Sequence, residues 1–233
     1  MFKRDYEVYG FKPDEESLLN LPGKHSLIYS TVKNYDGNGK EPNVLAKVLH
    51  QRGKDRSLSV GYRDRNDFLE QEVGPLIEKL KQLDKYFGGY IPPYYVEVSD
   101  EQKFDRFNCL DVPVVLYTFK VEESKENTAD EEKQFEVSLI GFINKCTEFL
   151  KIQHDEHIHP LMLPDVQLNN FIFGTHMGDN KKRLYFIDQH PPFVPAENVV
   201  TGPWLVQLVR RYPFIKKAAD QMYDYFEHRF DEG

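Results

Sequence analysis

The stretch "LPDVQLNNFIFGTHMGDNKKRLYFIDQHPPF", residues 163–193, decides how this chain is interpreted. It holds two apolar runs, "FIF" at 171–173 and "LYFI" at 184–187, and the segment between them contains two glycines and an Asp-Asn pair. This composition is typical of two short strands that fold back on each other through a turn. The stretch therefore predicts an antiparallel β-hairpin.

Three polar side chains stand at the edges of this hairpin. Asp165 and Asn170 precede the first apolar run, five positions apart, and Asp188 closes the second run. Folding the strands back would bring Asn170 and Asp188 to one end, where two oxygen-bearing side chains suit Mg²⁺. Asp165 would stand beside that metal, able to accept or orient the proton of an attacking hydroxyl. The competing interpretation is that all three side chains only cap turns.

The segments before this stretch predict strands around one helix. Residues 26–32 and 43–50 are apolar and flank a loop with Asp-Gly and Asn-Gly, which predicts another hairpin. Apolar residues at helical spacing fill 66–89, where Gly74-Pro75 is expected to kink or delay the helix. Two further strands are expected within 91–98 and 112–123.

The second half is mostly helical. The polar run 122–133 reads as a solvated loop or a helix start. The strongest helix covers 135–153, with one apolar face that is expected to lie in the core: Phe135, Leu139, Phe142, Ile143, Cys146, Phe149 and Leu150. Residues 204–230 predict one or two helices that break near Pro213. Strands followed by helices indicate an α+β fold with two lobes.

Composition narrows the function classes. The chain has 233 residues and 40% hydrophobic content, enough for a real core, and its net charge of -8 argues against a general nucleic-acid or anionic-membrane surface. Cys109 and Cys146 lack metal-type spacing and are expected to be reduced thiols. No stretch is long enough to span a bilayer and no signal-peptide run opens the chain, so a cytoplasmic protein is expected.

The order Asp165, Asn170, apolar strand, Asp188 resembles the protein-kinase-like superfamily, nearer to its aminoglycoside phosphotransferase and choline kinase branch than to the eukaryotic protein kinases. The resemblance implies one kinase-like domain with a β-rich, nucleotide-binding lobe at 1–119 and a short helical lobe at 120–233. It also implies ATP and Mg²⁺, with Asp165 catalytic and Asn170 and Asp188 as metal ligands. The implied activity is phosphoryl transfer to a hydroxyl of a small molecule or a protein.

The same resemblance implies nucleotide-binding residues in the first half. Lys47, in "NVLAKVL", would hold the ATP phosphates, with Glu72 as its ion-pair partner and Glu70 as the alternative. Gly23 would lie in the loop that covers the nucleotide. Adenine would make backbone hydrogen bonds around Tyr117 to Phe119.

Other interpretations stay open. A pseudokinase or kinase-fold module could use the same groove for a regulator or a partner protein, a reading favoured by Leu163 where the family usually has His two residues before the catalytic Asp. Nucleotidyl transfer and a non-kinase α+β protein without nucleotide binding are further alternatives. The cluster His154, His157 and His159 matches no zinc spacing and is expected to be a polar helix terminus.

Overall fold

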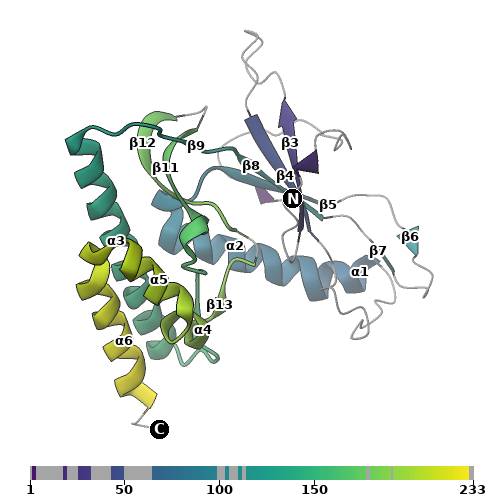
Figure 1. The fold of residues 1–233 in the computed structure, drawn as a ribbon. Coiled ribbons are helices and arrows are strands. Elements are labelled where there is room, and N and C mark those ends of the chain that lie inside the picture. The colour runs from purple at the N-terminus through teal and green to yellow at the C-terminus, as the bar shows by residue number, and fades with distance from the viewer. Residues whose placement is uncertain are drawn as a thin grey trace. The chain divides into compact units, whose positions relative to one another are not determined.

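The computed structural model describes residues 2–3, 18–19, 26–32, 43–49, 65–98, 103–104, 110–111, 114–176, 179–189 and 191–230. The chain divides into two compact units (Figure 1). The first unit comprises Met1–Lys79 and Pro92–Lys120, and the second comprises Leu80–Ile91 and Val121–Gly233. Helices together with small antiparallel sheets confirm the predicted α+β class.

The first unit contains a six-stranded antiparallel sheet in the order β1-β5-β8-β4-β3-β2. Its strands are β1 (Phe2–Lys3), β2 (Leu18–Leu19), β3 (Ser26–Val32), β4 (Asn43–Leu49), β5 (Tyr94–Val98) and β8 (Val114–Phe119). β3 pairs with β4 from Ser26↔Leu49 to Val32↔Asn43, which confirms the predicted hairpin. A separate pair joins β6 (Lys103–Phe104) and β7 (Leu110–Asp111).

The predicted helix over 66–89 forms with the expected interruption. α1 (Arg65–Phe68) is followed by a π-helical turn at Leu69–Val73, and α2 (Gly74–Phe87) then continues to a 3-10 turn at Gly88–Tyr90. Pro75 has no N–H to donate to the preceding turn, and a wider π turn is one way in which a helix accommodates such a break. The C-terminal part of α2 is buried in the second unit through Leu80, Leu83 and Phe87.

The expectation for 112–123 needs correction, because this run is two strands in different sheets. β8 ends at Phe119 in the six-stranded sheet, whereas β9 (Glu122–Glu123) pairs with β11 (Phe171–His176) in the second unit. Past Phe119 the sequence continues as Lys120, Val121, Glu122 and Glu123. One of the boundaries between the two units lies between Lys120 and Val121.

Helix α3 (Ala129–Asp155) carries the core of the second unit. Its predicted apolar face is buried from Leu139 to Leu150, including the free thiol of Cys146. Phe142 lies at the centre, with ring centroids 5.2 Å from Phe87, 5.0 Å from Phe171 and 5.6 Å from Phe186. These rings pack α3 against the hairpin formed by β11 and β12 (Asp179–Phe186).

Three more helices complete the second unit: α4 (Ala196–Val200), α5 (Pro203–Arg211) and α6 (Lys216–Phe230). The predicted break at Pro213 is confirmed as a 3-10 turn, Pro213–Ile215, between α5 and α6. α6 lies along α3 (Figure 1). The segment before α4, which shows no strand pattern in its sequence, contributes β13 (Val194–Pro195), which pairs with β10 (Met162–Leu163).

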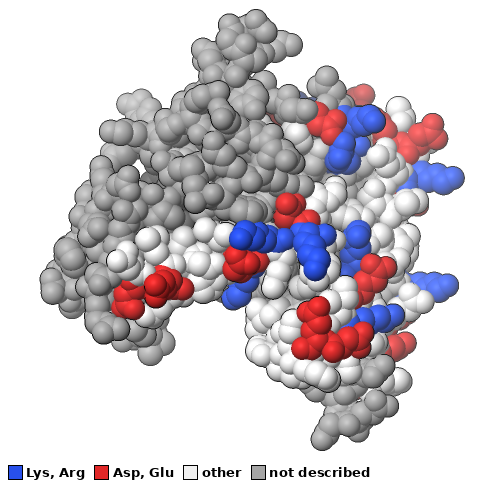
Figure 2. Space-filling model, turned by 180° about the vertical axis from the view of Figure 1, so that it is seen from behind, with Lys and Arg blue, Asp and Glu red and all other residues white. Residues whose placement is uncertain are grey.

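Two surface properties of the described residues are the distribution of their charges and the hydropathy of their helices. On the face seen in Figure 2, acidic and basic side chains of the described residues are interspersed rather than gathered by sign. Within the part of the chain that the structure describes, no helix combines the length and the apolar character needed to cross a membrane.

Candidate functional site

The predicted hairpin is confirmed, and its register places two of the three candidate side chains. β11 and β12 pair antiparallel with Phe171 opposite Phe186. One step beyond, the backbone N–H of Ile187 donates to the carbonyl of Asn170 at 2.9 Å. Asn170 and Asp188 therefore lie at the same end of the hairpin, next to adjacent strands.

The loop between β10 and β11 brings in the third side chain. A 3-10 turn, Leu168–Asn170, closes this loop, with the Asn170 N–H donating to the Gln167 carbonyl at 3.0 Å. The buried Asn170 side chain donates through Nδ2 to the backbone carbonyl of Asp165 at 2.9 Å. Because Nδ2 makes this bond, Oδ1 is the amide atom suited to a cation. The five-residue spacing from Asp165 to Asn170 thus corresponds to a loop that this hydrogen bond closes.

Asp165 lies in a partly buried, electronegative environment. Burial raises the pKa of its carboxyl, and the nearby charge of Asp188 raises it further. Hydrogen bonds from the side chain and backbone of Gln167 act in the opposite direction without cancelling these effects. The charge of Asp188 therefore acts on the Asp165 carboxyl, and a cation near both groups would offset this effect.

The donor set fits Mg²⁺ rather than zinc. Across the described residues, no group of three or more His, Cys, Asp or Glu side chains could hold a metal ion. Asn170 and Asp188 offer two oxygen donors, and Mg²⁺ commonly takes only one or two protein carboxylates and completes its shell with water and phosphate. Of these two metals, Mg²⁺ is the one whose ligand preference the oxygen donors of Asn170 and Asp188 match.

The other strand edge of the hairpin is fixed by a close backbone crossing. β9 pairs with β11 through Gly174↔Glu123 and Thr175↔Glu122. A Cβ atom added at Gly174 would lie 1.9 Å from the Glu122 carbonyl oxygen, so only glycine fits there. A glycine inside a strand is a known sign of a close backbone approach, and this was the available sequence signal for β9.

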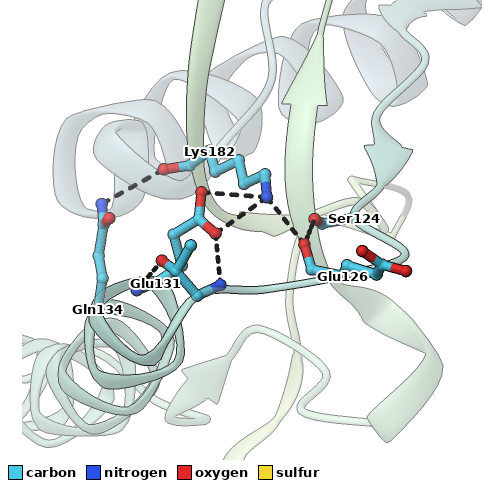
Figure 3. Close-up of polar contacts among 6 residues, drawn as sticks. Ser124, Glu126, Glu131, Gln134 and Lys182 are labelled. Atoms are coloured by element: carbon cyan, nitrogen blue, oxygen red, sulfur yellow. Dashed lines mark hydrogen bonds and ion pairs between the residues drawn. The ribbon is translucent and has the colours of Figure 1, made fainter.

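Beyond β9, polar contacts tie the chain to the hairpin (Figure 3). The Lys182 ammonium lies 3.0 Å from the Glu131 carboxylate and donates to the Glu126 carbonyl at 3.0 Å, and Ser124 donates to the same carbonyl at 2.8 Å. Thr128 and Glu131 form a capping box at the start of α3. The backbone N–H of Thr128 and the Lys182 ammonium lower the pKa of Glu131. The predicted polar run is therefore a structured connection that ends in a helix cap.

Part of the nucleotide-binding prediction falls on residues of which little is described. Lys47 lies in β4, opposite Ile28 on β3 and Leu116 on β8, and Glu72 lies in the π turn. The side chains of both residues, and all of Gly23, lie outside the described part of the chain. Their roles stay predictions.

The segment that is predicted to bind adenine lies in β8. Tyr117 and Phe119 are buried in β8, which has β4 on one side and β5 on the other. The Phe119 N–H donates to the Pro93 carbonyl at 3.2 Å. The sheet thus uses the Phe119 N–H, and the role of Tyr117 to Phe119 toward adenine stays a prediction.

The histidine cluster is a polar helix terminus, as predicted. α3 ends in a Schellman motif in which the Ile158 N–H donates to Gln153 at 2.8 Å and the His157 N–H donates to His154 at 3.0 Å. His157 adopts a left-handed conformation with φ of 56°. Glycine usually takes this position, which explains why the sequence did not mark the helix end.

Sequence reasoning missed Gln153, which is 3% exposed. It lies three residues after Leu150 and continues the buried face of α3. A polar residue on an apolar stripe was the signal, since a buried amide needs hydrogen-bond partners.

Comparison with known proteins adds no relative: no protein-family model matches the chain, and no match is found among curated proteins.

Proposed function

We propose that the protein is an ATP- and Mg²⁺-dependent phosphotransferase that acts on a hydroxyl group of a small molecule or a protein, with its two units as the lobes of a protein-kinase-like fold. One observation carries the proposal. The Asn170–Ile187 backbone bond at 2.9 Å sets Asn170 beside the chain leading to Asp188, and the charge of Asp188 acts on the carboxyl of Asp165. The resemblance assigns its phosphoryl-transfer roles to these three residues.

The chain's own residues have separable tasks in this reaction. Asp165 would orient the acceptor hydroxyl and accept its proton, as a carboxylate within hydrogen-bond reach can do. Asn170 and Asp188 would hold Mg²⁺. Phosphoryl transfer needs little covalent help from the protein, so holding these groups in place supplies most of the catalysis.

Mg²⁺, when bound, would neutralise the charge of the phosphate oxygens. Lys47 keeps the role that the resemblance implies, which is to hold the ATP phosphates with Glu72 or Glu70 as its partner. Lys47 lies on β4 of the first unit, and Asn170 and Asp188 belong to the second unit.

Nucleotide binding tests the proposal through thermal stability. ATP at about 100 times its dissociation constant should stabilise the native protein by about 2.7 kcal/mol, which raises Tm by several degrees. The shift should require Mg²⁺ and should disappear in Asp188→Asn. The same change at the other end of the hairpin, Asp179→Asn, is the matched control and should keep the shift. Equal Mg²⁺-dependent shifts in both variants, or no shift in the wild type, would contradict the proposal.

A second candidate is a kinase-fold module that binds nucleotide or a partner protein without transferring phosphate. The observation that favours it is the engagement of the Asp165 carboxylate by both donors of Gln167. Transfer from γ-labelled ATP to a panel of hydroxyl compounds and proteins separates the two candidates. Mg²⁺-dependent binding with no transfer in either the wild type or Gln167→Ala would favour the binding module.

A further inference from the structure

Gln153 occupies an unusual position in the second unit. It lies in the last turns of α3, 3% exposed, yet its side chain faces backbone rather than other polar side chains. The Met162 N–H donates to Oε1 at 2.9 Å, and Nε2 donates to the Met162 carbonyl at 2.8 Å. Nε2 also lies 3.3 Å from the Phe149 carbonyl within the helix. Both polar atoms of the amide are therefore used.

These two bonds complete a small sheet. β10 pairs with β13 on one side, and the Leu161 carbonyl accepts from the Ala196 N–H at 2.8 Å. Backbone groups alternate in direction along a strand, so those of Met162 point away from β13. They meet the Gln153 amide, which offers the same donor and acceptor pair that a neighbouring strand would. One side chain thus takes the place of a third strand.

The anchored strand leads directly to Asp165. Leu163 is fully buried and pairs with Val194, and the buried Pro164 follows with its restricted φ. Little conformational freedom therefore remains between Met162 and Asp165. Restraining Met162 therefore also restricts the position of the Asp165 carboxyl, the group that would orient the acceptor.

We propose that Gln153 is a positioning residue for Asp165: its amide holds Met162, and thereby sets where the Asp165 carboxyl stands relative to Asn170 and Asp188. This inference rests on the proposed function for its catalytic consequence. It assigns Gln153 to the placement of the acceptor-orienting group and leaves the metal ligands to the hairpin.

Gln153→Met tests the anchor, because methionine keeps the length and removes both hydrogen-bonding atoms. Gln134→Met is the matched control: the same change on the same helix, at an exposed glutamine that donates to the Lys182 carbonyl at 3.3 Å. Exchange of the Met162 amide hydrogen, measured by NMR, should accelerate at least about tenfold in Gln153→Met and stay unchanged in Gln134→Met. The Ala196 amide, which bonds to Leu161 independently of Gln153, should change far less.

The catalytic consequence has its own readout. Release of phosphate from Mg²⁺-ATP, with water as the acceptor, should slow by about tenfold to a hundredfold in Gln153→Met. Stabilisation by Mg²⁺-ATP should stay near the wild-type value, since Asn170 and Asp188 are held by the hairpin. A faster Met162 exchange with an unchanged rate would reduce Gln153 to a structural residue and overturn the positioning role.

A measurement on the wild type keeps the inference testable if Gln153→Met does not fold. The side-chain amide hydrogens of Gln153 should exchange much more slowly than those of Gln134. Equal exchange would overturn the anchor, as would a protected Met162 amide in a folded Gln153→Met variant. If the wild type neither binds ATP nor releases phosphate, the proposed function fails, and slow or fast exchange at Gln153 still decides the anchor separately.

Discussion

The two ends of α3 hold their neighbours in different ways. At the N-terminal end, Glu131 caps the helix and pairs with Lys182, and the two side chains keep 26% and 29% of their exposure. At the C-terminal end, Gln153 is 3% exposed and bonds only to backbone. One end uses a charged pair in contact with water, and the other uses a neutral amide that water does not reach.

The contrast between the two ends shows where polar contacts determine structure. An exposed ion pair exchanges hydration for a similar interaction and gains little, whereas losing a partner inside the protein leaves buried groups unsatisfied. The stretch that follows the buried end contains Asp165, the proposed acceptor-orienting residue. The end of α3 that the buried Gln153 amide holds is therefore the one that leads into the candidate site.

The largest expected effect on the free energy of unfolding comes from Gln153→Met, and Lys182→Met at the other end of α3 is its comparison. Gln153→Met should lower the free energy of unfolding by about 2 to 4 kcal/mol, because two partly buried backbone groups of Met162 lose their partner. Lys182→Met should cost less than about a quarter of that, because its contacts are open to solvent. Urea unfolding at pH 7 measures both. Similar losses in the two variants would remove the contrast between the ends.

Gly174→Ala tests whether the N-terminal end depends on the backbone crossing rather than on Lys182. The new methyl group would overlap the Glu122 carbonyl, so β9 must shift, at a cost of about 1 to 3 kcal/mol. Gly89→Ala is the control, since a Cβ there meets nothing within 4 Å. The Ser124 amide, which donates to the Phe173 carbonyl at 3.1 Å, should exchange faster only in Gly174→Ala. Unchanged exchange there would show that β9 does not depend on the glycine.

Asp165→Asn should stabilise the protein at pH 7 by less than about 1 kcal/mol, a figure that allows for solvent screening at a half-buried group. The folded-state pKa of Asp165 is raised, so ionisation opposes folding above that pKa, and the gain should vanish in acid, where both forms are neutral. In the control, Asp179→Asn, the sign reverses, because the Lys181 N–H and the Arg183 guanidinium lower the pKa of Asp179. Thermal unfolding from pH 3 to pH 8 would show both trends, and a loss of stability in Asp165→Asn at pH 7 would contradict this account.

The smallest effect concerns the Schellman end of α3. His157 has a positive φ, which costs a non-glycine residue roughly 1 to 2 kcal/mol, and His157→Gly removes that strain while adding chain entropy to the unfolded state. A net gain of about 0.5 kcal/mol is expected in urea unfolding. The exposed Asp155→Gly within the helix should instead destabilise. A loss in His157→Gly would show that the conformation at 157 is not left-handed.

Local patterns predicted much of this molecule. The hairpins at 26–49 and 171–187, the core face of α3 and the break at Pro213 all follow from periodicity and turn residues close in sequence. The position of Asn170 and Asp188 at the same end of the second hairpin follows from that hairpin alone. Such features need no knowledge of distant partners.

What the sequence did not predict depends on distant segments. β9 exists because Gly174 lets the chain at Glu122 approach, fifty residues away along the chain. Gln153 matters because Met162 lies where its amide can reach it.

Direct titration of the Asp165 carboxyl by NMR, in the wild type and in Asp188→Asn, tests most directly whether the three site residues converge. We expect a pKa above the ordinary 3.8 in the wild type. In Asp188→Asn it should fall part of the way, because burial, the larger cause, remains while the neighbouring charge is gone. An ordinary pKa in the wild type, or one that does not respond to Asp188→Asn, would show that these carboxyls do not share a site.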